Sequence, residues 1–273
     1  MSFISLNFVA LFACTFILYH VLPPRCKKAV LLAASFVFIG FYHIAFLGVA
    51  LLISIATYLF GLWMGRGKDD REVKRIYFSS VCFLVASWLA SRYAGQLTGC
   101  NFIFPLGISF YTFQAISYLT EIYWQEEEPE RNLPDFLVYM LFFMKFLSGP
   151  IERAGDMLPQ LKSGKAVDYQ SMVYGLELIV VGLVKKLMLA DSIGSYIDGI
   201  FNSPHTASGI QLLTACLLYP IELYGDFSGY TDIALGGARM LGFRLSPNFN
   251  RPFVAKTITD FWRRWHMSLS FWV

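Results

Sequence analysis

His266 stands in a stretch whose residue types could do chemistry at a membrane. This stretch, TDFWRRWHMSLSFWV, covers residues 259–273 and sets the histidine among tryptophans and paired arginines. A neutral imidazole can accept the proton of a hydroxyl group as that oxygen attacks a carbonyl carbon, and burial favours the neutral form. For a lone histidine, however, the default interpretation is structural: a helix along the interface, with arginines among phosphate groups and tryptophans at headgroup depth.

A second set of polar residues lies upstream, in the stretch YPIELYGDFSGYTDIALGGARMLGF, residues 219–243. Asp226 and Asp232 stand there among apolar neighbours. We expect Pro220, Ser228 and the glycines to interrupt the helix, which is tolerated at membrane depth only beside protein or a water-filled cavity. The alternative is that the acids merely hold helices together by pairing with basic residues. The candidate partners are Lys185, Lys186 and Arg239.

These residues must be positioned by a membrane fold. Hydrophobic residues make up 56% of the chain, charged residues 15%, and the mean hydropathy is +0.53, whereas soluble domains usually carry roughly 25% charged residues. The net charge of +3 is too small to imply a nucleic-acid partner. Neither the histidines nor the cysteines have metal-ligand spacing, so we expect no metal site.

Long uncharged runs predict an all-α fold, a polytopic membrane helical bundle with interrupted or re-entrant helices. In the second half of the chain, ionisable residues interrupt every apolar run, and at membrane depth such residues usually face a cavity or one another, so function is expected there. Five spans are predicted at residues 3–22, 29–47, 48–64, 76–90 and 102–123, with a break around Tyr42 and His43, a re-entrant or interfacial segment at 136–147, and charged or broken runs at 172–190, 210–224 and 229–241.

Basic residues predict the orientation of the chain. Lysines and arginines cluster at residues 25–28 and 66–75, whereas the connection that lies between these loops in the sequence has none. By the positive-inside rule both loops face the cytoplasm and the amino terminus faces outward. The stretch FLSGPIERAGDMLPQLKSGK, residues 146–165, is also expected on the cytoplasmic side. It either borders a donor entrance or docks a partner, or it is an ordinary interfacial loop.

The helix that carries His266 has a predicted start. Thr257, followed by Asp260 three residues later, matches a capping box. From this start the helical period places Arg263 and Arg264 away from one shared face. That face is predicted to hold Phe261, Trp262, Trp265, His266 and Leu269.

Five ordered motifs make the whole chain resemble the membrane-bound O-acyltransferase family, in the branch of alginate O-acetylation membrane proteins. The motifs are PLGISFYTFQAISYLTEIY (105–123), SGPIERAGDMLPQL (148–161), YGDFSGYTDIALGGARMLGF (224–243), NFNRPF (248–253) and FWRRWHMSLSFW (261–272).

The resemblance implies one membrane domain over residues 1–273, with spans in residues 1–123 and a half that forms a tunnel in residues 124–273. A co-substrate such as acetyl-CoA or an acyl carrier would donate the acyl group from the cytoplasm, with no bound cofactor, and the acceptor hydroxyl would approach from the opposite face. His266 would be the first of two active-site histidines, in an accessory or acid/base role. Tunnel-lining or substrate-binding residues would be Asp226, Ser228, Tyr230, Asp232, Asn250 and Arg264.

The implied function is transfer of an acyl group, above all acetyl, to hydroxyls of an exported polysaccharide such as alginate. The chain would lie in the bacterial inner membrane as a multi-pass protein in contact with membrane lipid. It would work with the polysaccharide or with a periplasmic acetyl-transfer partner protein. The rival hypothesis, from a different class, is a non-catalytic membrane scaffold or channel subunit of a polymer-secretion complex.

The resemblance also implies a second histidine, usually assigned as the catalytic base, in a later helix some tens of residues beyond FWRRWH. Since the sequence stops at Val273, we expect the chain to be truncated at its carboxy terminus, without that base and without the last spans. On this expectation the stretch 1–273 alone would not turn over substantially.

Overall fold

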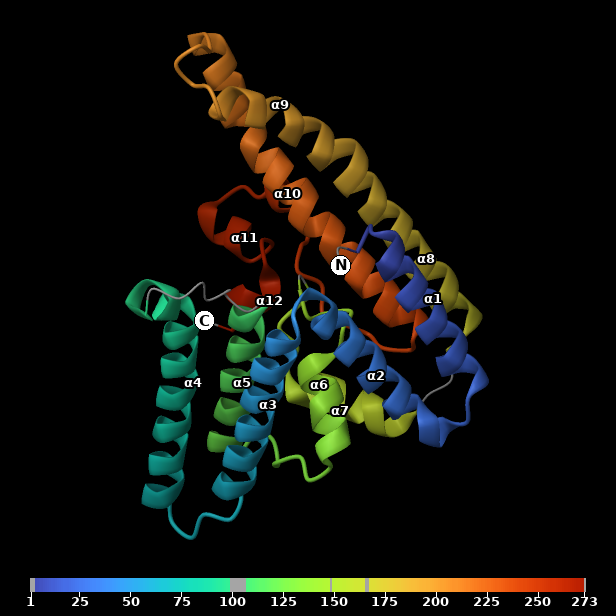
Figure 1. Ribbon diagram of the computed structural model, residues 1–273, viewed down its shortest axis with the longest axis vertical. Coiled ribbons are helices and arrows are strands. Elements are labelled where there is room, and N and C mark those ends of the chain that lie inside the picture. The colour runs from blue at the N-terminus through green and yellow to red at the C-terminus, as the bar shows by residue number, and fades with distance from the viewer. Residues whose placement is uncertain (1–2, 99–106, 148, 165–166, 273) are drawn as a thin grey trace. The chain divides into compact units, whose positions relative to one another are not determined.

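The computed structural model describes residues 3–98, 107–147, 149–164 and 167–272, with the backbone alone at 94–98. All regular structure in these residues is helical, which confirms the all-α fold class. The chain forms two compact units. The first contains helices α1 to α7 together with Trp272, and the second contains α8 to α12 (Figure 1). The expectation of a single membrane domain stays a prediction.

The helices of the first unit follow the uncharged runs of the sequence. The break expected around Tyr42 and His43 is confirmed, since His43 has extended backbone angles and its Nδ1 accepts a hydrogen bond from the Ala45 amide at 3.2 Å. This bond caps the next helix. Residues 102–106 of the fifth expected span lie outside the described residues. The helices are α1 (Leu6–Val21), α2 (Pro24–Tyr42), α3 (Ile44–Met64), α4 (Asp70–Thr98), α5 (Ile108–Tyr123), α6 (Leu133–Leu141) and α7 (Ala154–Ser163).

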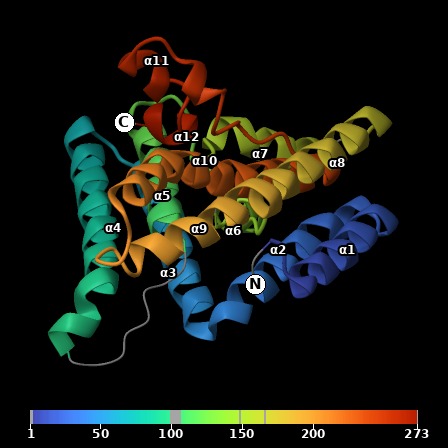
Figure 2. The same ribbon diagram turned by 90° about the horizontal axis from the view of Figure 1, so that it is seen from above.

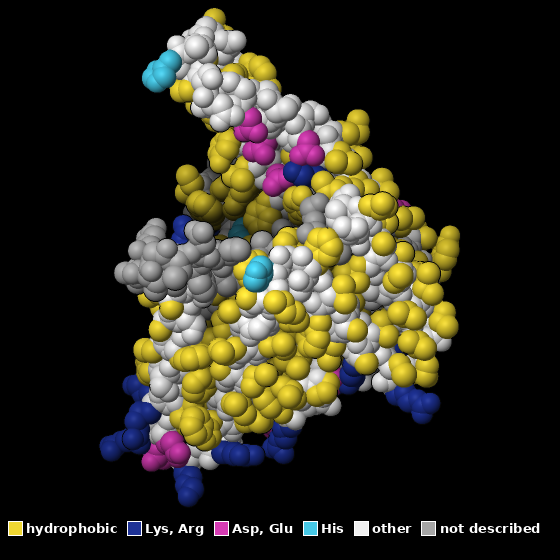
Figure 3. Space-filling view, in the orientation of Figure 1, with side chains coloured by type: hydrophobic (Ala, Val, Ile, Leu, Met, Phe, Trp, Pro, Cys, Tyr) yellow, Lys and Arg dark blue, Asp and Glu magenta, His cyan; other side chains and the backbone are white. Residues whose placement is uncertain are grey.

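Two helices in the described residues are long and apolar enough to cross a membrane, at Ile44–Met64 and Asp70–Tyr93. The helix α1 is apolar but shorter, at 16 residues. The two basic stretches are residues 25–28, at the start of α2, and residues 66–75, which lead into α4. They lie at the same end of the first unit, where Figure 3 shows lysine and arginine side chains below a largely hydrophobic surface. This separation of charge from apolar surface fits helices that sit in a membrane.

The helix α5 is central to the first unit and packs against α3, α4 and α6. Its Tyr118 is fully buried, with the ring centroid 4.8 Å from that of Phe136. A Cβ on Gly61 of α3 would lie 2.9 Å from the Tyr118 ring, so glycine is required where the two helices meet. The Tyr118 hydroxyl in turn accepts a hydrogen bond from the Glu130 amide at 3.0 Å.

After α6 the chain stays buried but is no longer helical. The amide of Phe143 donates to the Ser35 hydroxyl at 3.2 Å, which satisfies a backbone group that has left the helix. Lys145 is also buried, and its ammonium donates to Gln114 Oε1 at 2.6 Å and lies 4.7 Å from the centroid of the Tyr139 ring. The helix therefore ends inside the stretch 136–147 that the sequence predicts to be re-entrant or interfacial.

An ion pair joins α7 to the loop before α6. Lys162 Nζ lies 2.6 Å from Glu130 Oε2, and the Asn132 amide donates to Glu130 Oε1 at 2.9 Å. Burial alone raises the pKa of Glu130, but these hydrogen bonds outweigh it and lower the pKa overall, while the Glu130 carboxylate raises the pKa of Lys162. The pair therefore stabilises the fold above the unfolded pKa of Glu, about 4.3, and below that of Lys, about 10.4.

We predict that Lys162→Met lowers the free energy of unfolding by about 1 kcal/mol at pH 7, because one partner of the pair is half exposed. The loss should shrink as the pH falls through the lowered pKa of Glu130, since the protonated carboxyl no longer needs the lysine. Thermal unfolding in detergent at pH 7 and at pH 3 would measure both values. The control is Lys68→Met, an exposed lysine in a loop; an equal effect of Lys162→Met at both pH values would contradict the account.

The second unit is built on a long helix pair. Its elements are α8 (Tyr169–Leu183), the π-helix η1 (Val184–Ala190), α9 (Asp191–Phe201), α10 (Gly209–Met240), the 3₁₀ turn η2 (Pro252–Val254), α11 (Ile258–Trp262) and α12 (Met267–Ser270).

The expected interruption of the helix around residues 219–243 is wrong. The helix α10 runs without a break for 32 residues, with Pro220 inside it. Its glycines serve close approach instead: a Cβ on Gly182 of α8 would lie 2.6 Å from the Gly229 carbonyl oxygen, and a Cβ on Gly229 would lie 2.8 Å from that of Gly182. The helices α8 and α10 can therefore run side by side with their backbones in contact (Figures 1 and 2).

Candidate functional site

His266 lies at the amino-terminal end of α12, in a sharp turn. The structure replaces the single helix expected from Thr257 onward by two short helices, α11 and α12, although Thr257 does cap α11 as predicted, accepting from the Asp260 amide at 3.1 Å. His266 has φ +42°, a left-handed conformation that is uncommon for residues other than glycine. Its carbonyl accepts hydrogen bonds from the Leu269 and Ser270 amides, both at 3.0 Å.

The imidazole of His266 packs edge-on against Phe227 of α10, with ring centroids 4.9 Å apart and an interplanar angle of 80°. Neither α11 nor α12 is long enough to span a membrane, so His266 lies outside the spanning helices. Burial lowers the pKa of its imidazole to about 4. The side chain is therefore neutral at pH 7 and able to accept a proton.

An aromatic cluster surrounds this contact. Trp265, the neighbour of His266, stacks on Phe261 with centroids 5.6 Å apart and meets Phe249 edge-on at 5.2 Å. Phe249 also lies edge-on to Phe227 at 5.1 Å, so the cluster joins α10 to α11. The rings that complete it are Tyr224 and Phe253.

The loop before η2 holds the turn in place. The Met267 amide donates to the Asn248 carbonyl at 2.8 Å, and the Ser268 hydroxyl donates to Asn248 Oδ1 at 2.6 Å. Asn250, a predicted site residue, donates its amide to the Arg264 carbonyl at 2.9 Å. These bonds hold the residues on both sides of His266, and they account for the break between α11 and α12.

Asp226, on α10, is held by a lysine. Lys186 Nζ lies 2.5 Å from Asp226 Oδ1 and 2.6 Å from Asp191 Oδ1, so one ammonium joins η1, α9 and α10. The same ammonium lies 5.3 Å from the centroid of the Tyr230 ring. Figure 3 shows acidic and basic side chains together in this region, among hydrophobic ones.

Asp232 is paired in the same way. Lys185 Nζ lies 2.6 Å from Asp232 Oδ2 and 5.6 Å from the centroid of the Tyr224 ring, which links this pair to the aromatic cluster. The expected pairing of the acids with Lys185 and Lys186 is therefore found for Asp226 and Asp232, and their role in a site stays a prediction. Both lysines belong to the π-helix η1, and short π-helical segments occur frequently at functional sites.

Two predicted site residues have other environments. Ser228 is buried on α10, and within the described residues its hydroxyl has no hydrogen-bond partner. Arg264 is half-exposed, and its Nε donates to Asp260 Oδ1 at 2.8 Å. The guanidinium of Arg264 therefore pairs with an acid of its own segment, and its contact with Asn250 is made by the backbone.

Most of the predicted site residues are thus connected by contacts with residues that the sequence analysis did not identify. Phe227 provides the contact with His266, Asn248 holds the turn, and Lys186 connects Asp226 with Tyr230. The signal for Asn248 is its place in the motif NFNRPF, and the signal for Phe227 is its position between two predicted site residues. In the described residues no group of histidine, cysteine and acidic side chains could hold a metal ion.

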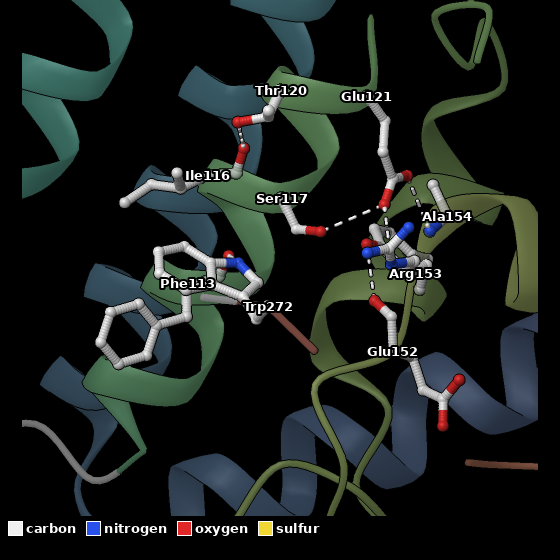
Figure 4. Close-up of polar contacts among 10 residues, drawn as sticks. Phe113, Ile116, Ser117, Thr120, Glu121, Glu152, Arg153, Ala154 and Trp272 are labelled. Atoms are coloured by element: carbon white, nitrogen blue, oxygen red, sulfur yellow. Dashed lines mark hydrogen bonds and ion pairs between the residues drawn. The ribbon is translucent and has the colours of Figure 1, made fainter. Parts of the chain in front are cut away.

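A separate polar cluster lies in the first unit, in the motifs at residues 105–123 and 148–161. Glu121 is buried, and its carboxylate accepts from the Ser117 hydroxyl at 3.1 Å and from the Ala154 amide at 3.3 Å, with Arg153 Nε at 4.0 Å (Figure 4). On the same helix, the Phe113 carbonyl accepts from the Trp272 indole at 3.1 Å. These contacts explain the two motifs as the anchor between α5 and the start of α7.

The amino-acid sequence is similar to those of several known acyltransferases. The chain is 34% identical over its full length to the probable alginate O-acetylase AlgI of Azotobacter vinelandii, of which it covers 58%. It is 35% identical over 62% of its length to the peptidoglycan O-acetyltransferase of Helicobacter pylori, of which it covers 37%. It is also 35% identical over 63% of its length to the teichoic acid D-alanyltransferase of Bacillus subtilis, of which it covers 44%.

The chain spans little more than half the length of the alginate O-acetylases it matches. The sequence profile of the membrane-bound O-acyltransferase family matches residues 125–273, which include the whole cluster around His266. The chain belongs to the membrane-bound O-acyltransferase family.

Proposed function

We propose that this protein transfers an acyl group, acetyl above all, to hydroxyls of an exported polysaccharide such as alginate. The observation that carries the proposal is the neutral, partly buried imidazole of His266, which is held in a fixed turn against Phe227 of α10. Its place within the part of the chain that matches an acyltransferase family supports this chemistry. The names of the relatives, an alginate O-acetylase and a peptidoglycan O-acetyltransferase, support a polysaccharide acceptor.

In this proposal the residues around His266 act by positioning. The imidazole accepts the proton of the acceptor hydroxyl as its oxygen bonds to the acyl carbon of a thioester donor, or supports a second group that does so. The carbon–sulfur bond then breaks, and the thiolate leaves with the proton that the hydroxyl gave up. The aromatic cluster keeps water away from the reacting groups, and the bonds to Asn248 keep the imidazole in one orientation. Tunnel-lining roles for Ser228, Tyr230 and Asn250, alongside Asp226, Asp232 and Arg264, remain part of the proposal.

The donor is proposed to be a cytoplasmic thioester such as acetyl-CoA or an acyl carrier, which acts as co-substrate. The protein is proposed to lie in the bacterial inner membrane as a multi-pass helical bundle, with the amino terminus outside and the basic loops at residues 25–28 and 66–75 in the cytoplasm. The acceptor is either the polysaccharide itself or a periplasmic protein that passes the acetyl group on. Both basic stretches lie at the same end of the first unit, which supports this orientation.

A second candidate function is a non-catalytic scaffold in a polymer-secretion complex. The ion pairs of Asp226 with Lys186 and of Asp232 with Lys185 favour it, since they hold helices together without any substrate.

The experiment that separates the two functions is complementation. The complete protein, as the cell makes it, is produced in a bacterium that exports the polysaccharide but lacks its own O-acetyltransferase, and ester-linked acetyl on the polymer is measured by NMR. An acyltransferase restores the ester. Export of unacetylated polymer, with the protein present and folded in the membrane, would support the scaffold instead.

A further inference from the structure

The second unit contains a pocket that the proposed reaction does not use. Its volume is about 420 Å³, and it lies where the start of α8 meets the end of α10. One wall comes from α8 with Tyr169 and Tyr174, and the other from Arg239 and Arg244 at and beyond the end of α10. Where a helix pair lies in a membrane, arginine and tyrosine together at its end are typical of the headgroup region.

The guanidinium of Arg239 could bind an anionic ligand. Its guanidinium lies over the Tyr174 ring, with Cζ 5.5 Å from the ring centroid, a cation–π contact. Its Nε is buried and, in the part of the chain that the structure describes, donates no hydrogen bond, and Arg239 forms no ion pair there. A partly buried guanidinium without a carboxylate partner is costly, so an anionic oxygen beside the guanidinium of Arg239 would be stabilised.

Two carboxylates, those of Asp168 and Glu177, also line the pocket, but they do not fill this role. Asp168 caps α8, and its Oδ1 accepts the Ser171 amide at 2.6 Å; this hydrogen bond lowers the pKa of Asp168, with smaller contributions from Arg239 and Arg244. Asp168 is fully exposed, so its attraction to the arginines is screened by water. Glu177 lies farther along α8 and is exposed as well. Neither acid comes within ion-pair distance of Arg239.

The surface beside the pocket is apolar. From Val173 onward, the helix α8 and the π-helix η1 expose a row of large hydrophobic side chains, which an acyl chain could cover. The members of this row are Val173, Leu176, Val180, Val181 and Val184. A charged donor pair next to an apolar helix face matches the two ends of a phospholipid better than a wholly soluble anion.

We propose that this pocket binds the phosphate of an anionic phospholipid, with Arg239 and Arg244 as its ligands. Basic pockets at the ends of membrane helices bind the headgroups of anionic lipids. The inference rests on the proposed membrane location and not on the acyl-transfer chemistry. Loss of lipid binding and loss of acetylation are therefore separate results.

The test measures lipid retention by the purified full chain. The protein is exchanged into mixed micelles that contain phosphatidylglycerol or phosphatidylcholine, and bound lipid is counted by native mass spectrometry. Phosphatidylglycerol is expected to bind in preference. Arg239→Gln and, separately, Arg244→Gln are each expected to weaken this binding about tenfold. Because Arg244 is exposed, its variant keeps the test valid should Arg239→Gln unfold the protein.

The matched control is Arg263→Gln, an exposed arginine of the same unit outside the pocket, which should bind phosphatidylglycerol as the unaltered protein does. Inorganic phosphate at millimolar concentration is added as a competitor and should displace little lipid. Equal binding of both lipids, unchanged binding by a folded arginine variant, or complete displacement by inorganic phosphate would each overturn the proposal, the last by pointing to a soluble phosphate ligand.

Discussion

Replacing His266 by alanine is expected to lower the initial rate of acyl transfer by the complete protein about 10²- to 10⁴-fold, which is the usual contribution of a positioned acid or base. The reason is that the neutral imidazole of His266, held in a fixed turn against Phe227, is the group proposed to take up the hydroxyl proton or to support the group that does so. The variant His266→Asn is the sharper test. Asparagine tolerates the left-handed backbone of this position better than alanine but cannot take up a proton near pH 7.

The control for both variants is His205→Ala, which removes an exposed imidazole and should leave the rate unchanged. Rates are measured with isolated membranes and corrected for the amount of folded protein. A His266→Asn variant that folds and transfers acetyl at the unaltered rate would remove this residue from the reaction.

Replacing Gly182 by alanine is expected to lower the free energy of unfolding by about 1–3 kcal/mol, the usual cost of overpacking. The new Cβ would lie 2.6 Å from the Gly229 carbonyl oxygen and 3.0 Å from the Ile233 amide nitrogen, so the α8 and α10 backbones must separate. Because α10 also carries Phe227, acyl transfer should fall together with stability. Thermal unfolding in detergent, followed by tryptophan fluorescence, gives the measurement.

Gly199→Ala is the matched control for this substitution. Gly199 is also in a helix, but a Cβ there would have no atom within 4 Å, so alanine should be neutral or should stabilise by up to about 1 kcal/mol. If the two variants unfolded at the same temperature, the close contact between α8 and α10 would not be the reason for glycine at residue 182.

Much of the helical fold of the first half could be predicted, because uncharged runs of bilayer length seldom form anything except helices. The prediction of an interrupted α10 failed for a physical reason. Gly229 and Pro220 suit a broken helix, and Gly229 equally suits a continuous one that approaches another backbone. The residues around Gly229 do not distinguish a broken helix from a continuous one. What decides is the close approach of Gly182, which is far away in the sequence.

The candidate site shows the same limit. The motif identified His266 and the cap at Thr257, but periodicity predicted one helix where two short ones exist. The break depends on hydrogen bonds that Asn248 accepts from Met267 and Ser268, beyond the turn, which no helical period reveals. For the acids, the sequence left two interpretations open. The contacts of Lys185 and Lys186 decide that they are ion-paired, and their place in a tunnel stays a prediction.

The central claim is that the cluster around His266 belongs to an enzyme that moves an acyl group across the membrane to a hydroxyl. Its most direct test uses inside-out membrane vesicles that contain the complete protein and enclose the polysaccharide, with labelled acetyl donor supplied only on the exposed cytoplasmic face. The account predicts ester-linked label on the enclosed polymer, and none with His266→Asn. Folded, unaltered protein that leaves the polymer unlabelled, with every partner protein of the native membrane present, would contradict it.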